Sequence, residues 1–418
     1  MRVLVVGSGA REHALAWKLS RSEAVREVYA APGNPGIAAV ANCVPIPADA
    51  IVELAEFASS LHVDLTVVGP ELPLVLGIAD EFSRRGLLLL GPSRAAAEVE
   101  GSKVFTKEFC ARHQIPTARA RVVANRDEAV AAVREIGLPV VLKADGLAAG
   151  KGVTICRSRA EEESALARYF DQRSFGAAAD RVLVEECLEG EEVSFMVLTD
   201  GASVLPLASA RDYKRLGDGD RGPNTGGMGS ISPAPVDPEV AAAILRDIVH
   251  PTVDGLAGEG RTYRGVLYAG VMVTPGGPKL LEYNCRLGDP ETQAVIPRLD
   301  GDLLPLLLAA ARGELGAVRA GWRHEVTACV VLASAGYPES PRRGDPIAGL
   351  GDALAQPGAL VFHAGTALHD GRLVTAGGRV LSVVGRGATP DEARRTAYDA
   401  VARIAFDGAQ YRRDIGRT

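Results

Sequence analysis

The chain has no excess of positive charge and no long hydrophobic run, and each absence excludes a class of protein. Its 418 residues carry a net charge of −6, which provides no basic face for nucleic acid. Apolar runs such as LLPLLLAAA at 303–311 fall far short of the ~20 residues that span a bilayer. The N-terminus, MRVLVVGSG, lacks the layout of a signal peptide. We therefore expect a cytoplasmic protein that binds neither nucleic acid nor a membrane.

Cysteine is also scarce, and its spacing does not indicate a metal site. The six cysteines contain no C-x-x-C, and most lie in apolar segments, which favours buried free thiols. Cys110 and His113 are three residues apart, but no second pair accompanies them. The seven histidines form no H-E-x-x-H, so none of the common zinc motifs is present.

Lysine is rare as well, with seven lysines against 39 arginines. Six of the seven lie between residues 103 and 279. A chain that uses arginine almost everywhere keeps lysine where a compact, flexible cation is needed. The distribution therefore points to the middle of the chain as the part that carries chemistry.

The length suggests two to four domains, and the pattern of elements changes along the chain. In residues 1–100, strands expected over 2–6, 26–30, 64–68 and 87–90 alternate with helices near 12–21, 49–60 and 74–85. This alternation predicts a parallel, Rossmann-like sheet. GSGARE (7–12) follows the first strand, but Glu12 replaces the third glycine of a dinucleotide motif and would repel a pyrophosphate. We expect a smaller polar or anionic ligand there; an NAD-dependent oxidoreductase is the alternative.

Residues 101–320 form a second expected unit and residues 321–418 a third. The second mixes strands with helices over 102–113, 127–136 and 238–258, and its Gly/Pro-rich stretch 215–235 is expected to be an irregular functional loop. The third is a small α+β unit without an obvious catalytic cluster, with strands over 324–334, 360–368 and 379–387 and a helix over 390–406. The predicted fold class is multidomain α/β and α+β.

The stretch VVLKADGLAAGKG (140–152) is the strongest local signal. A buried strand delivers Lys143, and the glycines that follow surround Lys151. Glycine backbone can turn its N–H groups toward an anion, and lysine adds a point charge. The spacing is wrong for a Walker A loop and is more typical of an ATP-grasp enzyme. An ordinary glycine-rich hairpin is the alternative.

The second strong signal is LLEYNCRLGDPET (280–292). On a strand, Glu282, Asn284 and Arg286 alternate and so share one face. The two oxygen-bearing side chains suit Mg²⁺, and the guanidinium suits a developing phosphate charge. A polar outer strand face with surface ion pairs is the alternative. Asp212 and Lys214 are weaker candidates for substrate contacts, because a solvated turn explains them equally well.

Several long motifs together resemble one known family. They are GSGAREHALAWKL, APGNPG (31–36), VVGPELPLV (67–75), GPSRAAAEVEGSKVFTK (91–107), LKADGLAAGKGV, GPNTGGMG (222–229) and EYNCRLGDPETQ. The chain is similar nearly end to end to the phosphoribosylamine–glycine ligases, or glycinamide ribonucleotide synthetases, of the ATP-grasp superfamily. The resemblance implies a Rossmann-like PreATP-grasp domain over 1–100, an ATP-grasp domain over 101–320 and a small C-terminal domain over 321–418.

The resemblance also implies an activity in de novo purine biosynthesis. Such an enzyme joins glycine to 5-phosphoribosylamine through a glycyl phosphate, uses ATP with Mg²⁺ or Mn²⁺, and releases ADP and phosphate. It is expected to act as a monomer or weak homodimer.

Site roles follow from the resemblance, motif by motif. ATP is expected at Lys103, Lys143, Gly150, Lys151, Glu186, Leu188 and Glu191, and the metal at Glu282 and Asn284. Arg286, Asp289 and Asp212 are expected at the reacting groups. Substrate contacts are expected from Gly9, Arg11, Glu12, Gly33, Asn34, Asp212 and Arg286.

Two departures and two further alternatives accompany this reading. Ala10 stands where the family usually has glycine, and Leu287 where it usually has phenylalanine. Another ATP-grasp ligase that uses formate or carbon dioxide is the closest alternative function. A nucleotide-binding regulator without activity is the other, which the presence of Lys103, Lys143 and Glu282 disfavours.

Overall fold

The N-terminal part of the chain folds around a five-stranded parallel sheet of order β3-β2-β1-β4-β5. The structure is a computed structural model that describes residues 1–146 and 152–417. The strands are β1 (Arg2–Gly7), β2 (Glu27–Pro32), β3 (Asn42–Cys43), β4 (Leu65–Val68) and β5 (Leu89–Leu90). The helices are α1 (Ala10–Leu19), α2 (Ile51–Ser60), α3 (Glu71–Leu76) and α4 (Ile78–Arg84). The expected Rossmann-like alternation is confirmed.

The helix expected over 74–85 is broken, which is a correction to the sequence analysis. Gly77 has a left-handed backbone (φ +95°) that ends α3, and α4 begins at the next residue. Glycine adopts this conformation without steric cost, so two short helices replace one.

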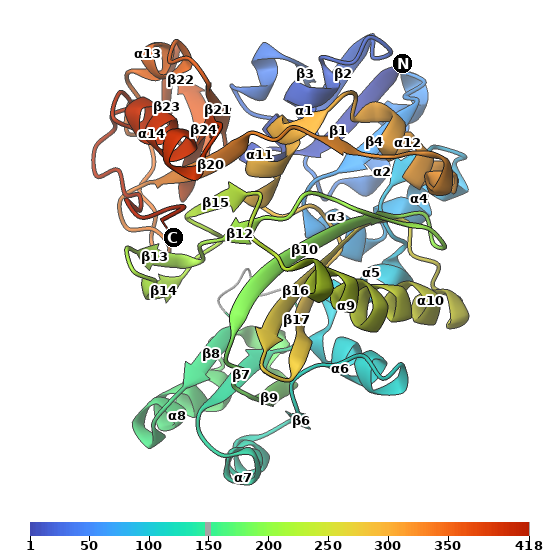
Figure 1. Cartoon of the computed structure of the whole chain (residues 1–418), viewed down its shortest axis with the longest axis vertical. Helices are drawn as coiled ribbons and strands as arrows, with labels where there is room; N and C mark the ends of the chain where they lie inside the picture. Colours follow the sequence, from blue (N-terminus) through green and yellow to red (C-terminus); the bar gives the residue numbers. More distant parts are fainter. Residues whose placement is uncertain (147–151, 418) are drawn as a thin grey trace.

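The next part of the chain builds a lobe that projects from the rest of the molecule (Figure 1). Its antiparallel sheet has the order β6-β9-β7-β8, and helices α7 (Arg126–Ile136) and α8 (Arg159–Leu166) pack on it. The strands are β6 (Ala120–Val123), β7 (Val140–Ala144), β8 (Val153–Cys156) and β9 (Val182–Glu186). β7, β8 and β9 match the strands expected around VVLKA, GVTIC and VLVEE, and β6 was not expected.

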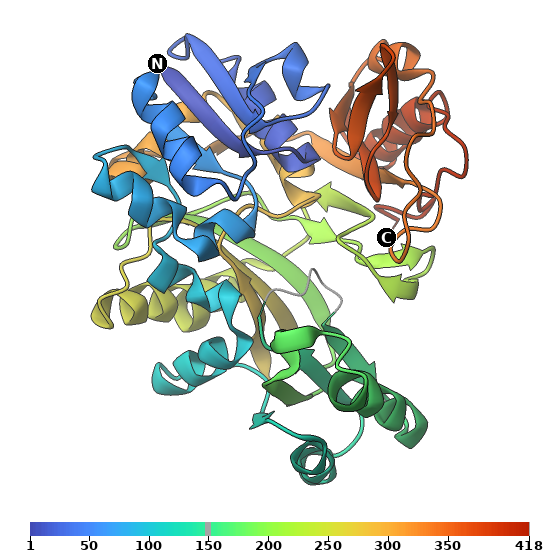
Figure 2. The ribbon, with the colours of Figure 1, turned by 180° about the vertical axis from the view of Figure 1, so that it is seen from behind.

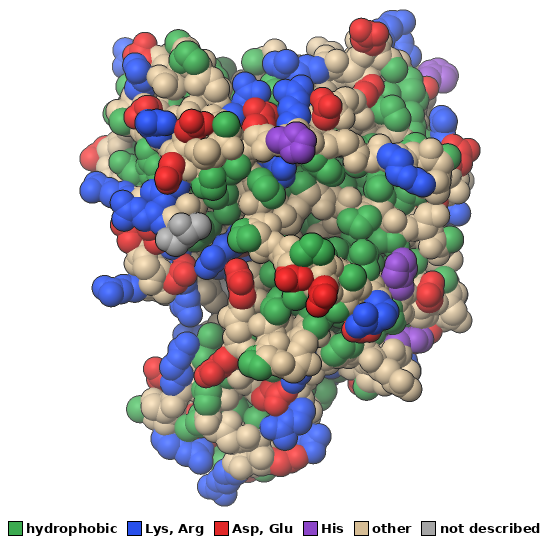
Figure 3. All heavy atoms as spheres, viewed as in Figure 1, with side chains coloured by type: hydrophobic (Ala, Val, Ile, Leu, Met, Phe, Trp, Pro, Cys, Tyr) green, Lys and Arg blue, Asp and Glu red, His purple; other side chains and the backbone are tan. Residues whose placement is uncertain are grey.

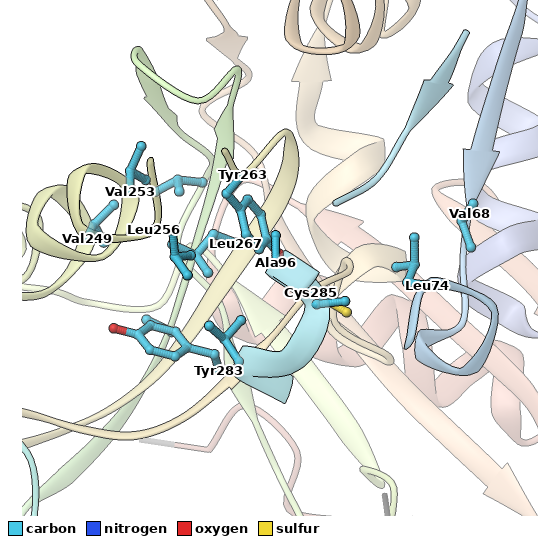
Figure 4. Packing of buried hydrophobic residues seen from close by; sticks show 14 of the residues in the cluster. Val68, Leu74, Ala96, Val249, Val253, Leu256, Tyr263, Leu267, Tyr283 and Cys285 are labelled. Carbon is cyan, nitrogen blue, oxygen red and sulfur yellow. The ribbon is translucent and has the colours of Figure 1, made fainter. Parts of the chain in front are cut away.

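A second antiparallel sheet, which we call the central sheet, has the order β11-β10-β16-β17 and lies between this lobe and the N-terminal part. Its strands are β10 (Glu191–Thr199), β11 (Val204–Pro206), β16 (Gly265–Thr274) and β17 (Gly277–Asn284). Helices α5 (Arg94–Gly101), α6 (Lys103–Arg112), α9 (Pro238–Ile244) and α10 (His250–Gly258) lie beside it. Val253 and Leu256 of α10 pack toward Leu267 and Tyr283 of the sheet, and all four are buried (Figure 4). Burying one such aliphatic side chain contributes about 1.5–3 kcal/mol.

The stretch 215–235 is not an irregular loop, so that expectation was wrong. It holds β13 (Arg215–Gly217), β14 (Arg221–Asn224) and β15 (Gly229–Ser232), and β12 (Arg211–Asp212) precedes it. β13 and β14 pair as a hairpin, while β15 pairs with both β12 and a strand of the C-terminal sheet. Glycine and proline lower strand propensity, and pairing across the chain overrides that preference here.

The C-terminal sheet has the order β12-β15-β20-β24-β21, and so combines segments more than a hundred residues apart. Its own strands are β20 (Val326–Ala333), β21 (Ala359–His363) and β24 (Arg379–Gly387), and α14 (Pro390–Val401) packs against it. The strand expected over 360–368 ends instead at His363, and β22 (Thr366–His369) pairs with β23 (Arg372–Thr375). Gly365 lies between β21 and β22, where a Cβ would come within 2.6 Å of the Gly377 backbone.

Short elements connect these sheets. They are α11 (Glu291–Val295), β18 (Leu299–Asp300), α12 (Leu304–Arg312), β19 (Gly321–Trp322) and α13 (Leu350–Leu354). Within the described residues, no helix is long and apolar enough to cross a bilayer.

The N-terminal part (blue) and the C-terminal part (red) lie next to each other in Figure 2, and they meet at a buried pair of histidines, His13 and His363. The backbone N–H of His363 donates to His13 Nδ1 (2.8 Å), and the two rings lie 5.6 Å apart edge to face. Burial lowers the pKa of His13 to about 3, with His363 adding to the effect, and burial lowers that of His363 to about 4. Both rings are therefore neutral at pH 7.

This interface makes stability depend on pH. Because both folded pKa values lie below the unfolded value of about 6.5, stability is full above pH 6.5 and falls as the pH drops toward 4. Each histidine contributes up to about 1.4 kcal/mol per pH unit in that window. We expect His13→Asn, which keeps an acceptor near the Nδ1 position, to lose stability less steeply between pH 6.5 and 4.5. Calorimetric midpoints measured across this range test it, and parallel curves for the two proteins would contradict it.

Candidate active site

Lysine side chains from separate elements gather where the projecting lobe meets the central sheet. Lys143 is the penultimate residue of β7, Lys103 begins α6, and Lys214 follows β12. Figure 3 shows basic side chains beside the notch where the outline of the molecule narrows between its upper body and the lobe. The three ammonium groups all act on one carboxylate, that of Glu282 on β17. Burial alone would raise the pKa of Glu282, but Lys214, Lys143 and Lys103 together hold it below its usual value.

A buried carboxylate holds the lysine at the strand end in place. Glu185 on β9 is 3% exposed, and its oxygens lie 2.8 Å from Lys143 Nζ and 3.2 Å from Lys107 Nζ. Lys143 also donates to the Leu281 carbonyl (3.1 Å). Burial would lower the pKa of Lys143, but Glu185 raises it, so the ammonium stays charged.

Lys103 and Lys214 have their own partners. Lys103 Nζ donates to the Gly146 carbonyl (2.8 Å), at the start of the predicted phosphate loop. Lys214 pairs closely with Glu192 and lies 3.9 Å from Glu282. The predicted loop residues Gly150 and Lys151 lie outside the described residues.

The donor set at Glu282 and Asn284 fits a small, hard cation. The two residues alternate on β17, and Asn284 Oδ1 accepts from Arg286 Nη2 (3.0 Å), so the expected shared face is confirmed. In the part of the chain that is described, no group of three or more His, Cys, Asp and Glu side chains could hold a metal. Two oxygen ligands alone suit Mg²⁺, which prefers few protein ligands and takes the rest from water and phosphate.

Arg286 is engaged with two carboxylates that the sequence analysis did not single out. Its guanidinium lies 3.2 Å from Glu71 of α3 and 3.4 Å from Glu100 of α5. Glu100 also accepts from the backbone N–H of Cys285 (2.6 Å). Arg286 therefore ties the end of β17 to the N-terminal part, and these contacts use donors that were expected to face phosphate.

A second group of acids lies near this arginine. Asp289 pairs with Arg379 of β24 (2.9 Å) and accepts from Gln293 (2.7 Å). The nearby Asp212 Oδ1 is buried and has no hydrogen-bond partner among the described residues. Burial raises the pKa of Asp212 well above its usual range, and the Glu291 carboxylate raises it further.

Glu291 is itself fixed by two hydroxyls. Its Oε1 accepts from Tyr268 (2.6 Å) and Ser194 (3.3 Å), and the side chain is buried. The position of Asp212 is constrained by Gly227, where a Cβ would lie 2.8 Å from Asp212 Oδ1 and 2.4 Å from Pro290. The glycine of the 222–229 motif therefore permits the close approach of these segments.

The turn after β1 faces the same region. Glu12 accepts from the Gly9 backbone N–H (2.5 Å) and from Arg11 (2.6 Å), and Arg11 also donates to the Leu287 carbonyl (3.1 Å). A Cβ at Gly69 would lie 1.9 Å from Glu12 Oε1, so the carboxylate fills the space above two strands. The Glu12 carboxylate thus already accepts a hydrogen bond from the Gly9 N–H, which a dinucleotide phosphate would otherwise use. This argues against the oxidoreductase alternative.

Asn34 is bonded to the turn after β1 and to the C-terminal part. Its Nδ2 donates to the carbonyls of Ser8 and His363, and its Oδ1 accepts from the N–H groups of Gly36 and Ile37 (2.8–2.9 Å). Gly33, with φ +73°, packs against Cys43. The amide of Asn34 is fully used in joining the N-terminal and C-terminal parts, and the substrate contacts expected from Gly33 and Asn34 remain predictions.

The expected adenine edge lies between β9 and β10. The Glu186 carboxylate accepts from the backbone and side chain of Arg119 (3.0 and 2.9 Å) and pairs with Lys279 (3.4 Å). Burial would raise the pKa of Glu186, but these partners lower it to about 2. Leu188 lies in the connection between the strands, and Glu191 is exposed at the start of β10. The roles expected at these three positions remain predictions.

Some residues of the site were missed from the sequence, and for most of them a signal was present. Glu71, Glu100, Lys107 and Glu291 lie inside motifs that were recognised without a role for these side chains. Glu185 directly precedes Glu186, for which a contact with ATP was expected, but no role was predicted for Glu185 itself. Arg379 had no local signal, because its unit shows no catalytic pattern.

Comparison with known families matches three stretches of the chain to three family models. The model of the phosphoribosylglycinamide synthetase N domain matches residues 1–100, that of the ATP-grasp (A) domain residues 101–292, and that of the C domain residues 327–418.

Known proteins resemble the chain over its whole length. A phosphoribosylamine–glycine ligase of Rhizobium meliloti is 51% identical over 417 residues, covering 100% of this chain and 98% of the relative. One of Pseudomonas aeruginosa is 50% identical over 420 residues, covering 100% and 97%.

Solved structures show the same fold. The crystal structure of a phosphoribosylamine–glycine ligase from Thermotoga maritima has 37% identity and a TM-score of 0.85, with coverage of 99% of this chain and 100% of that one. The biotin carboxylase domain of Hydrogenobacter thermophilus 2-oxoglutarate carboxylase, solved with MgADP and bicarbonate, shares the fold at 17% identity and a TM-score of 0.72, over 98% and 91% of the chains. The chain belongs to the phosphoribosylglycinamide synthetase family of ATP-grasp ligases.

Proposed function

We propose that the protein ligates glycine to 5-phosphoribosylamine with ATP, giving glycinamide ribonucleotide, ADP and phosphate in de novo purine biosynthesis. The observation that carries this is the gathering of Lys103, Lys143 and Lys214 around Glu282, next to an acidic group at Asp212. The names of the full-length relatives support it.

The cations answer a chemical need of this reaction. A carboxylate is a poor electrophile, so glycine must first be phosphorylated to glycyl phosphate, which the amine then attacks. Phosphoryl transfer depends on positioning and on neutralising charge at the phosphoryl oxygens. We assign Lys103 and Lys143 to the ATP phosphates, and Glu186, Leu188 and Glu191 to the adenosine.

Glu282 and Asn284 would hold Mg²⁺ or Mn²⁺. When bound, the metal supplies further neutralisation of phosphate charge. The three lysines keep Glu282 ionised, and Arg286 orients Asn284 through the hydrogen bond to its amide oxygen.

Glycine would lie between the acidic group and Arg286. Its ammonium suits Asp212 Oδ1, which has no hydrogen-bond partner within residues 1–146 and 152–417, because a buried carboxylate oxygen without a partner is costly and a cation relieves that cost. Its carboxylate would approach Arg286, and Asp289 is oriented by Arg379 nearby.

Phosphoribosylamine would lie against the turn after β1, where Gly9, Arg11 and Glu12 border Leu287 and Asp289. The amine attacks as the free base, so the site needs no general base of its own. Function as a cytoplasmic monomer or weak homodimer remains part of this proposal.

Phosphate release from MgATP tests the function, with glycine and phosphoribosylamine added singly and together. The proposal predicts release only with both, together with a product of the mass of glycinamide ribonucleotide. Release stimulated by formate or bicarbonate instead would move the chain to the other ATP-grasp ligases.

The metal assignment predicts the effect of Glu282→Gln. Replacing the carboxylate by a neutral amide weakens metal binding, and a loss of several kcal/mol of charge stabilisation corresponds to about a hundredfold or more in kcat. Glu339→Gln, at an exposed position of the C-terminal part, is the matched control and should be fully active. A folded Glu282→Gln enzyme with normal turnover at saturating Mg²⁺ would remove Glu282 from the metal site.

The phosphate assignment predicts different effects at the two lysines that share Glu185. Lys143→Met should weaken ATP binding about tenfold to a hundredfold, since a charge-assisted hydrogen bond is worth ~1.5–3 kcal/mol. Lys107→Met should bind ATP normally, because Lys107 already donates to Thr117 and the Ala118 carbonyl. Calorimetric titration with ATP measures both. Equal losses in the two variants would show that only the integrity of the Glu185 cluster matters.

A further inference from the structure

The chain near its C-terminal end is bonded to the hairpin that leads into the candidate site. β13 and β14 form this hairpin, and its base continues as a paired ribbon: Tyr213 and Gly229 are joined by a backbone hydrogen bond of 3.0 Å, and Met228 donates to the Tyr213 carbonyl (2.8 Å). Asp212 and Lys214 lie on either side of Tyr213 in this ribbon. Whatever holds the ribbon therefore sets the positions of both residues.

Arg412, which lies near the C-terminal end of the chain, holds this ribbon in place. Its side chain is 1% exposed, and it is among the largest fully buried side chains of the described residues. The guanidinium donates to Asp220 at the hairpin tip (2.6 Å) and to the carbonyl of Arg215 (3.2 Å). Its carbon lies 5.1 Å above the centre of the Tyr213 ring.

A second carboxylate completes this connection. Asp414 accepts two hydrogen bonds from Arg412 (2.8 and 2.7 Å) and one from the backbone N–H of Gly219 (2.8 Å). Hydrogen bonding to Arg412 lowers the pKa of Asp414, so the pair stays ionised across the physiological range. The planar fork of arginine suits this arrangement, and lysine cannot reproduce its paired bonds.

Backbone contacts support the same link. The N–H of Arg413 donates to Asp218 (2.7 Å), and that of Gly416 donates to the Tyr213 hydroxyl (3.0 Å). The segment thus meets the ribbon at its tip and at the residue between Asp212 and Lys214. None of the bonds is to the lobe that carries Lys143, so the connection acts on one side of the site only.

We propose that Arg412 is a positioning residue for the ligase reaction, which sets Asp212 and Lys214 through Tyr213 and the β13–β14 hairpin. The proposal rests on the proposed function for the role of these two residues. It predicts a selective effect: glycine use depends on Arg412, while ATP affinity depends on the lobe and does not. A small displacement of a substrate-orienting group can cost up to about a hundredfold in rate.

The test compares Arg412→Lys with Arg413→Gln, a change of the exposed neighbour in the same segment. We expect Arg412→Lys to lower kcat/KM for glycine about tenfold or more, with KM for ATP unchanged, and Arg413→Gln to behave as the parent. Asp220→Asn removes one partner at the surface and should show a smaller loss of the same kind, which covers the case in which Arg412→Lys does not fold. Equal changes in the KM values for glycine and ATP would overturn the proposal. So would unchanged kinetics in the folded Arg412→Lys and Asp220→Asn variants.

Hydrogen–deuterium exchange separates this proposal from the proposed function. We expect faster exchange over residues 213–228 in Arg412→Lys than in Arg413→Gln, without any substrate present. If the parent protein does not ligate glycine, the proposed function fails by itself. Unchanged exchange in this segment would overturn the positioning role whichever reaction the enzyme performs.

Discussion

The balance of buried charge between the lysines and their carboxylates is the constraint on which the rest of the structure depends. Cationic groups of like charge cannot share a partly buried site unless counter-charges lie close by. Glu185 neutralises Lys143 and Lys107, Glu192 neutralises Lys214, and two further glutamates flank Arg286. The carboxylates come from several strands and helices, so the cluster forms only when the lobe, the central sheet and the N-terminal part are packed together. The packing of these parts therefore creates a site that favours the binding of a strongly anionic ligand.

Arginines extend the same principle to the boundaries between parts of the chain. Arg286 joins β17 to α3, Arg11 joins α1 to the Leu287 carbonyl, and Arg379 joins the C-terminal sheet to Asp289. Each uses several donors of a planar, permanently charged group. The division between lysine and arginine that was visible in the composition therefore has a structural meaning: most of the lysines lie in the site and its surroundings, and arginines connect the parts that surround it.

The sequence predicted what is local and missed what depends on distant segments. Strand alternation placed Glu282 and Asn284 on one face, and a buried strand followed by glycines identified Lys143. Arg379 could not be predicted in this way, because its partner Asp289 lies 90 residues away and no local pattern marks it. The stretch 215–235 has the local composition of a loop, and the pairing of β15 with β20 that makes part of it a strand involves residues about a hundred positions later. Gly77 shows a further limit: the amphipathic pattern continued through a residue whose left-handed backbone ends the helix.

The central claim is that the charge cluster serves phosphoryl transfer to the glycine carboxylate. Glycine labelled with ¹⁸O in its carboxylate tests this most directly, with the released phosphate examined by mass spectrometry. If a carboxylate oxygen attacks the γ-phosphorus of ATP, that oxygen leaves with the phosphate when the amine displaces it, and the amide keeps the other. The account predicts one ¹⁸O atom in each phosphate formed. Phosphate free of label, alongside a normal yield of glycinamide ribonucleotide, would contradict it.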